Sequence, residues 1–319
     1  KAIKLLNNYG NPYLTSWDLP YLYPPLISNS ISKFNSEIFS IIYLTIYISS
    51  ICLIYFFSNK KLRISYLISV GISGILIKSL MTGNISNIFY ILVIFSIIFY
   101  SKYKSFFPYY ITVFIISLIK FNFIILFLLP LILNENFKKE FINFLIFACL
   151  ILAAYLYQYK FMYDDFYYFL DVLINNNTND HGSSLFSFFY YKLNINIYLS
   201  ILFHSSIFIF LLGFAFINKK KIDKNFYLLL IITILVFANP RLKLYDVAFG
   251  IIFLNISILY FPKKIILNFY IFNLYLVLIF KIVSKNFELN LENPKLLVWY
   301  IFTLFFYYFL KKHSKLKFS

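Results

Sequence analysis

The stretch NIYLSILFHSSIFIFLLGFAFI, residues 196–217, decides the fold of this chain. It runs for 22 residues without a charged side chain, and three lysines, Lys219–Lys221, follow almost directly. The hydrocarbon core of a bilayer is about 30 Å thick, which a helix of roughly 20 apolar residues spans. An uncharged run of this length followed by lysines is typical of a membrane-spanning helix that ends at an aqueous surface.

The composition of the whole chain agrees with this stretch. Of the 319 residues, 61% are hydrophobic and only 13% are charged, and the mean hydropathy is +0.79. Soluble domains carry about 25% charged residues, so we expect an all-α membrane protein surrounded by lipids. The net charge of +17 arises largely from short loops between apolar runs, which indicates membrane topology and no nucleic-acid partner.

Other apolar runs predict the remaining membrane segments. With the opening stretch they are 36–57, 64–81, 87–100, 109–133, 141–159, 196–217, 226–239, 247–261, 265–283 and 296–310. Lys120 and Asn122 interrupt the run 109–133, which we expect to cross twice or to dip into the bilayer and return. The chain is then one integral membrane domain over 1–319, a polytopic helical bundle of about 11 segments.

Lysine clusters predict which side of the membrane each loop occupies. If 109–133 returns, one side receives Lys60, Lys61 and Arg63; Lys102 and Lys104; Lys138 and Lys139; Lys219 to Lys221 and Lys224; Lys263 and Lys264; and Lys311, Lys312, Lys315 and Lys317. Short cytoplasmic loops are enriched in lysine and arginine, so we take this side as cytoplasmic. The outer side receives Lys120 and the loops 1–35 and 160–195, with most of the unusual polar groups.

The two outer loops have different characters. Pro24 and Pro25 prevent one continuous helix, which indicates either a rigid lead-in to the first span or a fixed roof over an outer cavity. In 160–195, aspartates alternate with aromatic residues from Asp164 to Asp171, which predicts an amphipathic helix at the membrane surface. Residues 175–184 have the composition of a turn-rich loop.

Two cationic positions point to anion chemistry. Lys120 lies within an apolar run, where a cation costs roughly 2.5–3.5 kcal/mol, so it either reaches the membrane boundary or faces a cavity that binds an anion. In 239–246, NPRLKLYD, Arg241 and Lys243 can clamp a phosphate or can pair with Asp246 in a solvated loop.

Histidine and cysteine spacing argues against a metal centre or a disulfide framework. His181, His204 and His313 are not at the spacing of metal ligands. Cys52 and Cys149 each lie within an apolar run, which predicts core thiols. We therefore expect no cofactor, and nothing in the sequence supports a divalent metal.

Taken in order, several short motifs resemble the GT-C-fold glycosyltransferases of the GT87 (DUF2029) family. They are Gly10-Asn-Pro-Tyr13, Tyr23-Pro-Pro-Leu26, Gly83-Asn84, Lys120, Ser183-Ser-Leu185 and the segment 239–246. The family usually has Gly-Gln in place of Gly83-Asn84, and a Trp/His-bearing stretch in place of 241–246. The resemblance implies inverting transfer of a hexose, with mannose the expected sugar, from a polyprenyl-phosphate-sugar donor to a lipid or glycan acceptor. It also implies a site on the outer face of a bacterial inner membrane.

The implied mechanism assigns roles to individual residues. The candidates for donor-phosphate binding are Lys120, Arg241 and Lys243, and those for sugar orientation are Asn84, His181, Tyr245 and Asp246. The family's general base is an Asp in the first outer loop. Asp18 is the only acid before Tyr23-Pro-Pro-Leu26, and we expect the base to be Asp18 or a residue of a first helix preceding Lys1.

Three alternative functions remain open at this point. A flippase for lipid-linked oligosaccharides predicts inverted repeats and polar groups at mid-membrane, which the sequence does not display. An enzyme similar to O-antigen polymerases predicts catalytic arginines in a large outer loop, whereas 160–195 contains none. A purely structural membrane subunit leaves Lys120 and Arg241 unexplained.

Overall fold

The structure is a computed structural model that describes residues 23–31, 36–57, 85–133, 136–179, 184–221 and 224–240. All regular structure in these residues is helical, so the predicted all-α class is confirmed for them. Two compact units divide the chain, one with the helices α2 to α10 and the other with α11 to α13. The predicted segments 64–81, 247–261, 265–283 and 296–310 lie outside the described residues.

The helices of both units follow the apolar runs closely. The first unit contains α2 (Pro25–Ile31), α3 (Ser36–Phe57), α6 (Ser86–Tyr103), α7 (Phe107–Ile119), a 3-10 helix (Phe121–Phe127), α8 (Leu128–Leu133), α9 (Phe137–Phe161) and α10 (Tyr163–Asn179). The second contains α11 (Leu185–Ser187), a π-helical turn (Phe188–Lys192), α12 (Ile197–Ile217), a 3-10 turn (Lys219–Lys221) and α13 (Lys224–Phe237). Asparagine side chains cap the start of α9 and of α12: the Asn136 side chain accepts from Lys139 N, and the Asn196 side chain accepts from Tyr198 N.

Two of these helices, α9 and α12, are long and apolar enough to cross a membrane. Only 17% of the apolar window of α9 and 28% of that of α12 is buried inside the protein, whereas a core helix of a soluble protein is mostly buried. Apolar side chains left exposed along most of a helix favour contact with lipid. Cys149 is exposed on α9, so its prediction as a core thiol is wrong.

The run 109–133 turns back on itself at Lys120. The backbone of Lys120 is extended, with φ −135° and ψ 102°, and it ends α7 before the 3-10 helix begins. The Tyr109 hydroxyl donates to the Leu126 carbonyl at 2.9 Å, although the two residues are 17 positions apart. In one continuous helix they would be roughly 25 Å apart at 1.5 Å per residue, so the prediction that this run returns is confirmed.

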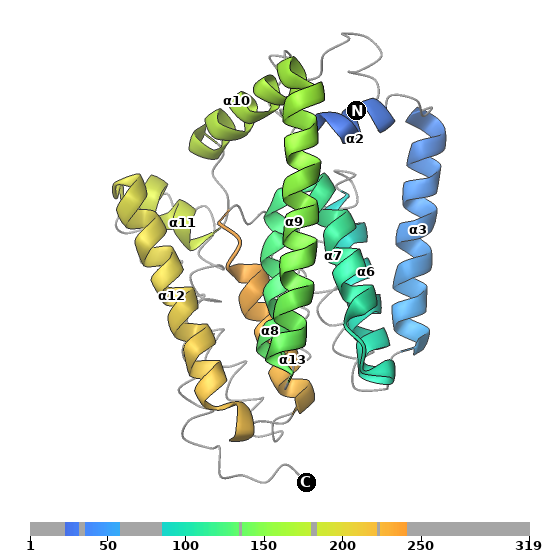
Figure 1. Ribbon diagram of the computed structural model, residues 1–319, viewed down its shortest axis with the longest axis vertical. Helices are drawn as coiled ribbons and strands as arrows, with labels where there is room; N and C mark the ends of the chain where they lie inside the picture. The colour runs from blue at the N-terminus through green and yellow to red at the C-terminus, as the bar shows by residue number, and fades with distance from the viewer. Residues whose placement is uncertain are drawn as a thin grey trace, which may run out of the picture. The chain divides into compact units, whose positions relative to one another are not determined.

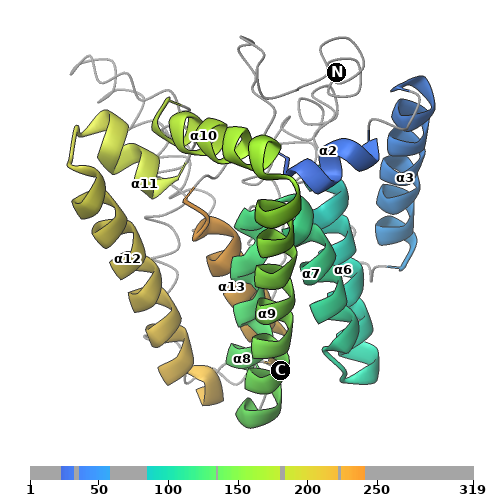
Figure 2. The same cartoon turned by 45° about the horizontal axis from the view of Figure 1, so that its top comes forward.

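Two helices, α2 and α10, lie across one end of the first unit. Figures 1 and 2 show α3, α6, α7 and α9 side by side, with α2 and α10 crossing the same end of this group. The chain bends at Met162, between α9 and α10. The predicted helix from Asp164 is confirmed, but the turn-rich loop predicted for 175–184 is wrong as far as Asn179, because α10 continues to that residue. Once a helix is nucleated, each added residue gains a backbone hydrogen bond, which outweighs the low helix propensity of asparagine here.

Candidate functional site

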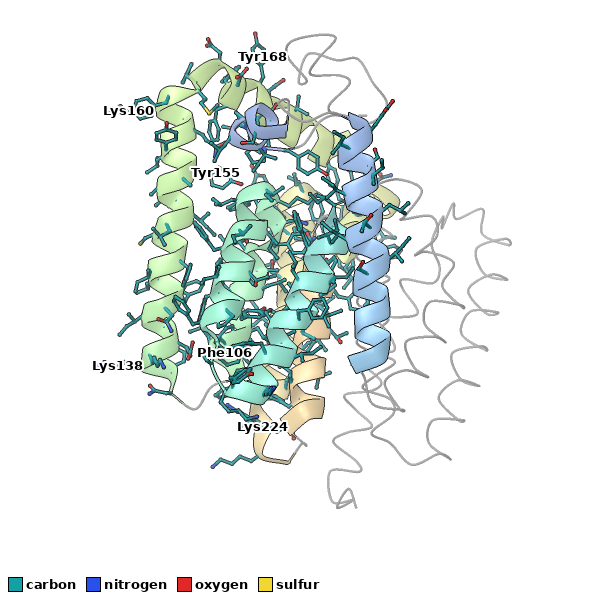
Figure 3. All side chains as sticks on the ribbon, turned by 90° about the vertical axis from the view of Figure 1, so that its right-hand side faces the viewer. Phe106, Lys138, Tyr155, Lys160, Tyr168 and Lys224 are labelled. Atoms are coloured by element: carbon teal, nitrogen blue, oxygen red, sulfur yellow. The ribbon has the colours of Figure 1, made fainter. Side chains whose placement is uncertain are left out.

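The first unit has two chemically different ends. Helix α6 begins at Ser86 and ends at Tyr103, so Lys102 and Lys104 lie about 25 Å from Ser86 along the axis. The Tyr110 hydroxyl near the start of α7 donates to the Glu140 carbonyl near the start of α9 at 3.0 Å, which brings Lys138 and Lys139 to this lysine-rich end. Figure 3 shows Phe106 and Lys138 at this end and Tyr155, Lys160 and Tyr168 at the opposite end.

Lys120 lies at the end opposite these four lysines, where the break after α7 places its side chain. Its ammonium nitrogen donates to the Ser86 hydroxyl at 2.6 Å and lies 5.7 Å from the centroid of the Tyr23 ring. Three segments far apart in the sequence therefore meet around one cation. A hydroxyl oxygen and the face of an aromatic ring both attract a positive charge without neutralising it.

Tyr23 presents an uncharged ring to this cation. Burial raises the pKa of the Tyr23 hydroxyl to about 12, and the nearby Tyr43 adds to this effect. The ring packs against the buried pair Phe166 and Phe169 of α10. The phenol therefore stays protonated at neutral pH, and its position depends on α10.

Gln158 fixes the backbone that follows Tyr23. Its side-chain oxygen accepts from Leu26 N at 3.1 Å, and its side-chain nitrogen donates to the Ala154 carbonyl at 3.3 Å. The N–H groups in the first turn of a helix have no partner within the helix. The fully buried Gln158, 132 positions away from Leu26, supplies a hydrogen-bond acceptor for one of these N–H groups of α2. The sequence reasoning missed Gln158, although an amide in the apolar run 141–159 was a usable signal.

In the second unit, Ser184 holds the start of the cationic segment 239–246. The Ser184 hydroxyl caps α11 by accepting from Ser187 N at 3.0 Å, and it donates to the Pro240 carbonyl. Ser184 belongs to the motif Ser183-Ser-Leu185, and Pro240 directly precedes Arg241. Two motifs that the family resemblance singled out are thus in direct contact.

His204 of α12 bonds to the backbone on both sides of its ring. Its Nδ1 accepts from Phe186 N at 3.2 Å, so Nε2 carries the proton and donates to the Ala238 carbonyl at 3.0 Å. This assigns the tautomer from the bonds. Both ring nitrogens are engaged in joining α11 and α12 to the end of α13, which is a structural role.

Most of the residues predicted for the site fall outside the part of the chain that the structure describes. They are Asp18, Asn84, His181, Arg241, Lys243, Tyr245 and Asp246. Lys120 is the member of the predicted set that is described, and the others stay predictions. Among the described residues, no group of three or more His, Cys, Asp or Glu side chains could hold a metal ion.

No protein-family model, curated protein or solved structure matches the chain.

Proposed function

We propose that the chain is a membrane glycosyltransferase of the GT-C type, which transfers a hexose from a polyprenyl-phosphate donor to a lipid or glycan acceptor. One observation carries the proposal. The ammonium of Lys120 is held by Ser86 and Tyr23 at the end of the first unit opposite the lysine-rich end. A cation fixed at the boundary of an apolar bundle matches a ligand whose phosphate lies at the membrane surface and whose tail lies in the lipid.

The proposed architecture is a bundle of about 11 membrane segments, with mannose as the expected sugar. The lysine-rich end faces the cytoplasm, in keeping with the enrichment of lysine in short cytoplasmic loops. Lys120 then faces the outer side of a bacterial inner membrane. The donor and the acceptor both reach the site from that side.

In the proposed reaction, a carboxylate removes the proton of the acceptor hydroxyl, and the oxygen attacks the anomeric carbon. The bond from that carbon to the phosphate oxygen breaks, and the polyprenyl phosphate leaves with the bonding electrons, so the sugar is inverted. Among the residues of this chain, Asp18 is the candidate base.

The chain's cations stabilise the charge that develops on the leaving phosphate. Lys120 supplies one positive charge, and Arg241 and Lys243 follow directly on Pro240, which Ser184 anchors. Such groups act most strongly where water is excluded. Asn84, His181, Tyr245 and Asp246 orient the sugars.

Sugar transfer in membrane vesicles tests this proposal. The vesicles contain wild-type or Lys120→Ala protein and a polyprenyl-phosphate hexose with a labelled sugar. We expect the variant to lose about 100-fold or more in rate, the typical cost of removing one group that stabilises a developing anion.

Lys160→Ala is the matched control, because Lys160 is an exposed lysine at the same end of the first unit, with its ammonium 5.3 Å from the Phe161 ring. It should retain wild-type activity. Full activity of Lys120→Ala contradicts the proposal. Movement of the intact donor between leaflets without transfer of the sugar favours a flippase instead.

A further inference from the structure

An exposed row of tyrosines, which the proposed function leaves unused, runs from the end of α9 onto α10. The row consists of Tyr159 near the end of α9 and of Tyr163 and Tyr167 on α10, spaced four residues apart, and each exposes more than half of its side chain. The ring centroids of successive members are 5.4 Å and 6.5 Å apart. The row continues from α9, a helix long enough to span a bilayer, onto α10. Figure 2 shows that α10 crosses the end of α9.

The other side of α10 is covered by the protein. Phe166 and Phe169 are buried and pack against Tyr23 and Tyr155. A helix turns by about 100° per residue, so Tyr163 and Tyr167 lie on the flank beside this packed side, and the exposed Asp164 lies farther round. The helix thus has a protein side, an aromatic flank and a polar side.

Charge distinguishes α10 from helices that anionic lipids attract. Between Tyr163 and Asn179 it contains three aspartates and neither lysine nor arginine. Helices held by anionic lipid headgroups carry lysine or arginine on their polar face. Tyrosine instead favours the membrane–water interface, where the ring meets apolar groups and the hydroxyl meets polar ones.

We infer that α10 lies in the headgroup layer of the bilayer, with the tyrosine row against the lipids and Asp164 toward water. The row is continuous with the exposed surface of α9, a helix whose apolar window is only 17% buried. An end of that helix is where the lipid surface meets water. The inference concerns the bilayer and does not rest on the transfer reaction.

The position of α10 in the bilayer also determines the depth of Lys120 in the membrane. The Tyr155 ring lies 5.6 Å from the Phe121 ring, next to Lys120, and 6.3 Å from the Phe166 ring of α10. The break in the run 109–133 therefore lies about one aromatic ring away from α10. With α10 in the headgroup layer, Lys120 lies near the depth of the lipid phosphates.

Depth-dependent quenching of a single tryptophan tests the inference. The full chain, with Trp17 and Trp299 replaced by Phe, is reconstituted in phosphatidylcholine vesicles that contain nitroxide lipids. The nitroxide is either near the headgroup or near the end of the acyl chain. Tyr167→Trp reports on the row, and Tyr163→Trp repeats the measurement should the first variant not fold.

Two further reporters calibrate the measurement. Leu152→Trp lies in the middle of α9 at a position that is 60% exposed, and Asp164→Trp lies on the polar side of α10. We expect headgroup nitroxides to quench Tyr167→Trp more than acyl-chain nitroxides do. For Leu152→Trp, acyl-chain nitroxides should quench more than headgroup nitroxides. Aqueous iodide should quench Asp164→Trp strongly.

Three outcomes overturn the inference. In the first, iodide quenches Tyr167→Trp as strongly as Asp164→Trp and neither lipid does, which means that the row faces water, where a sugar or a protein would contact it. In the second, acyl-chain nitroxides quench Tyr167→Trp most, which places α10 inside the hydrocarbon. In the third, neither kind of nitroxide lipid quenches Leu152→Trp, which would show that α9 does not lie in the bilayer.

Discussion

Lys120 and His204 are both polar side chains within apolar runs, one in each unit, but they differ in backbone conformation and in the groups that they contact. Lys120 breaks its run, and its backbone is extended. His204 lies within the unbroken helix α12. The partners of Lys120 include a side-chain hydroxyl and an aromatic face, whereas the ring of His204 bonds to two backbone groups.

The role of a polar residue at membrane depth depends on which groups it bonds to. Buried backbone N–H and C=O groups need a hydrogen-bond partner, so a side chain that bonds to them has a structural role. A cation beside a hydroxyl and an aromatic face at the boundary of an apolar bundle is instead a candidate for binding an anion. Variants of each residue and of its partners test this contrast.

The largest effect on stability is expected for His204→Leu. This change removes the partners of Phe186 N and of the Ala238 carbonyl, and each buried group left unsatisfied costs about 1–3 kcal/mol. We expect the free energy of unfolding in detergent to fall by about 2–4 kcal/mol. Leu202→Ala, an exposed neighbour on α12, is the control. Equal stability of the two variants would show that His204 is not structural.

A smaller effect, on activity, is expected for Ser86→Ala. A hydrogen bond to a charged group contributes about 1.5–3 kcal/mol, so misplacing the ammonium of Lys120 should lower the transfer rate about tenfold or more. Ser86→Thr keeps the hydroxyl and should restore most of the rate. The measurement is sugar transfer in vesicles. A transfer rate for Ser86→Ala equal to that of wild type would show that Ser86 does not position Lys120 for the reaction.

The smallest effect is expected for Tyr23→Phe, which keeps the aromatic face and removes only the hydroxyl. Its transfer rate should match that of wild type, whereas Tyr23→Leu should lose a few-fold, because a cation–π contact is worth about 0.5–2 kcal/mol. Equal rates for the Phe and Leu variants would exclude a role for the ring.

The pKa of Tyr23 adds a pH dependence to the same variant. Folding raises the pKa of this hydroxyl from 10.0 to about 12, so the folded state favours the protonated form. The resulting contribution to stability is complete below pH 10.0 and is lost as the pH rises toward about 12. As the pH rises through this window, the unfolding temperature should therefore fall less steeply for Tyr23→Phe than for wild type.

The helices of this protein could be predicted well from the sequence because they depend on local hydrophobicity. The run 196–217 differs from α12 by one residue, and the return of 109–133 followed from a lysine that lipid does not tolerate. The continuation of α10 to Asn179 was missed, because asparagine composition indicates a turn wherever the packing of the preceding residues is unknown.

The contacts of the candidate site could be predicted only in part. Placing Lys120 and 1–35 on one side followed from charge, but the pairing of Lys120 with Ser86 and Tyr23 depends on how three separate segments pack. The contact of Gln158 with Leu26 joins residues 132 positions apart, and no local pattern encodes it. Likewise, nothing in the spacing of the three histidines indicated that His204 would bond to the backbone.

Under the proposed function, Lys120 binds the phosphate of a polyprenyl lipid. Native mass spectrometry of the purified full chain with polyprenyl phosphate tests it without requiring transfer activity. Wild type and Lys160→Ala should retain the lipid phosphate, and Lys120→Ala should lose it while keeping the same unfolding temperature in detergent. Equal retention of the lipid by all three proteins would contradict the account.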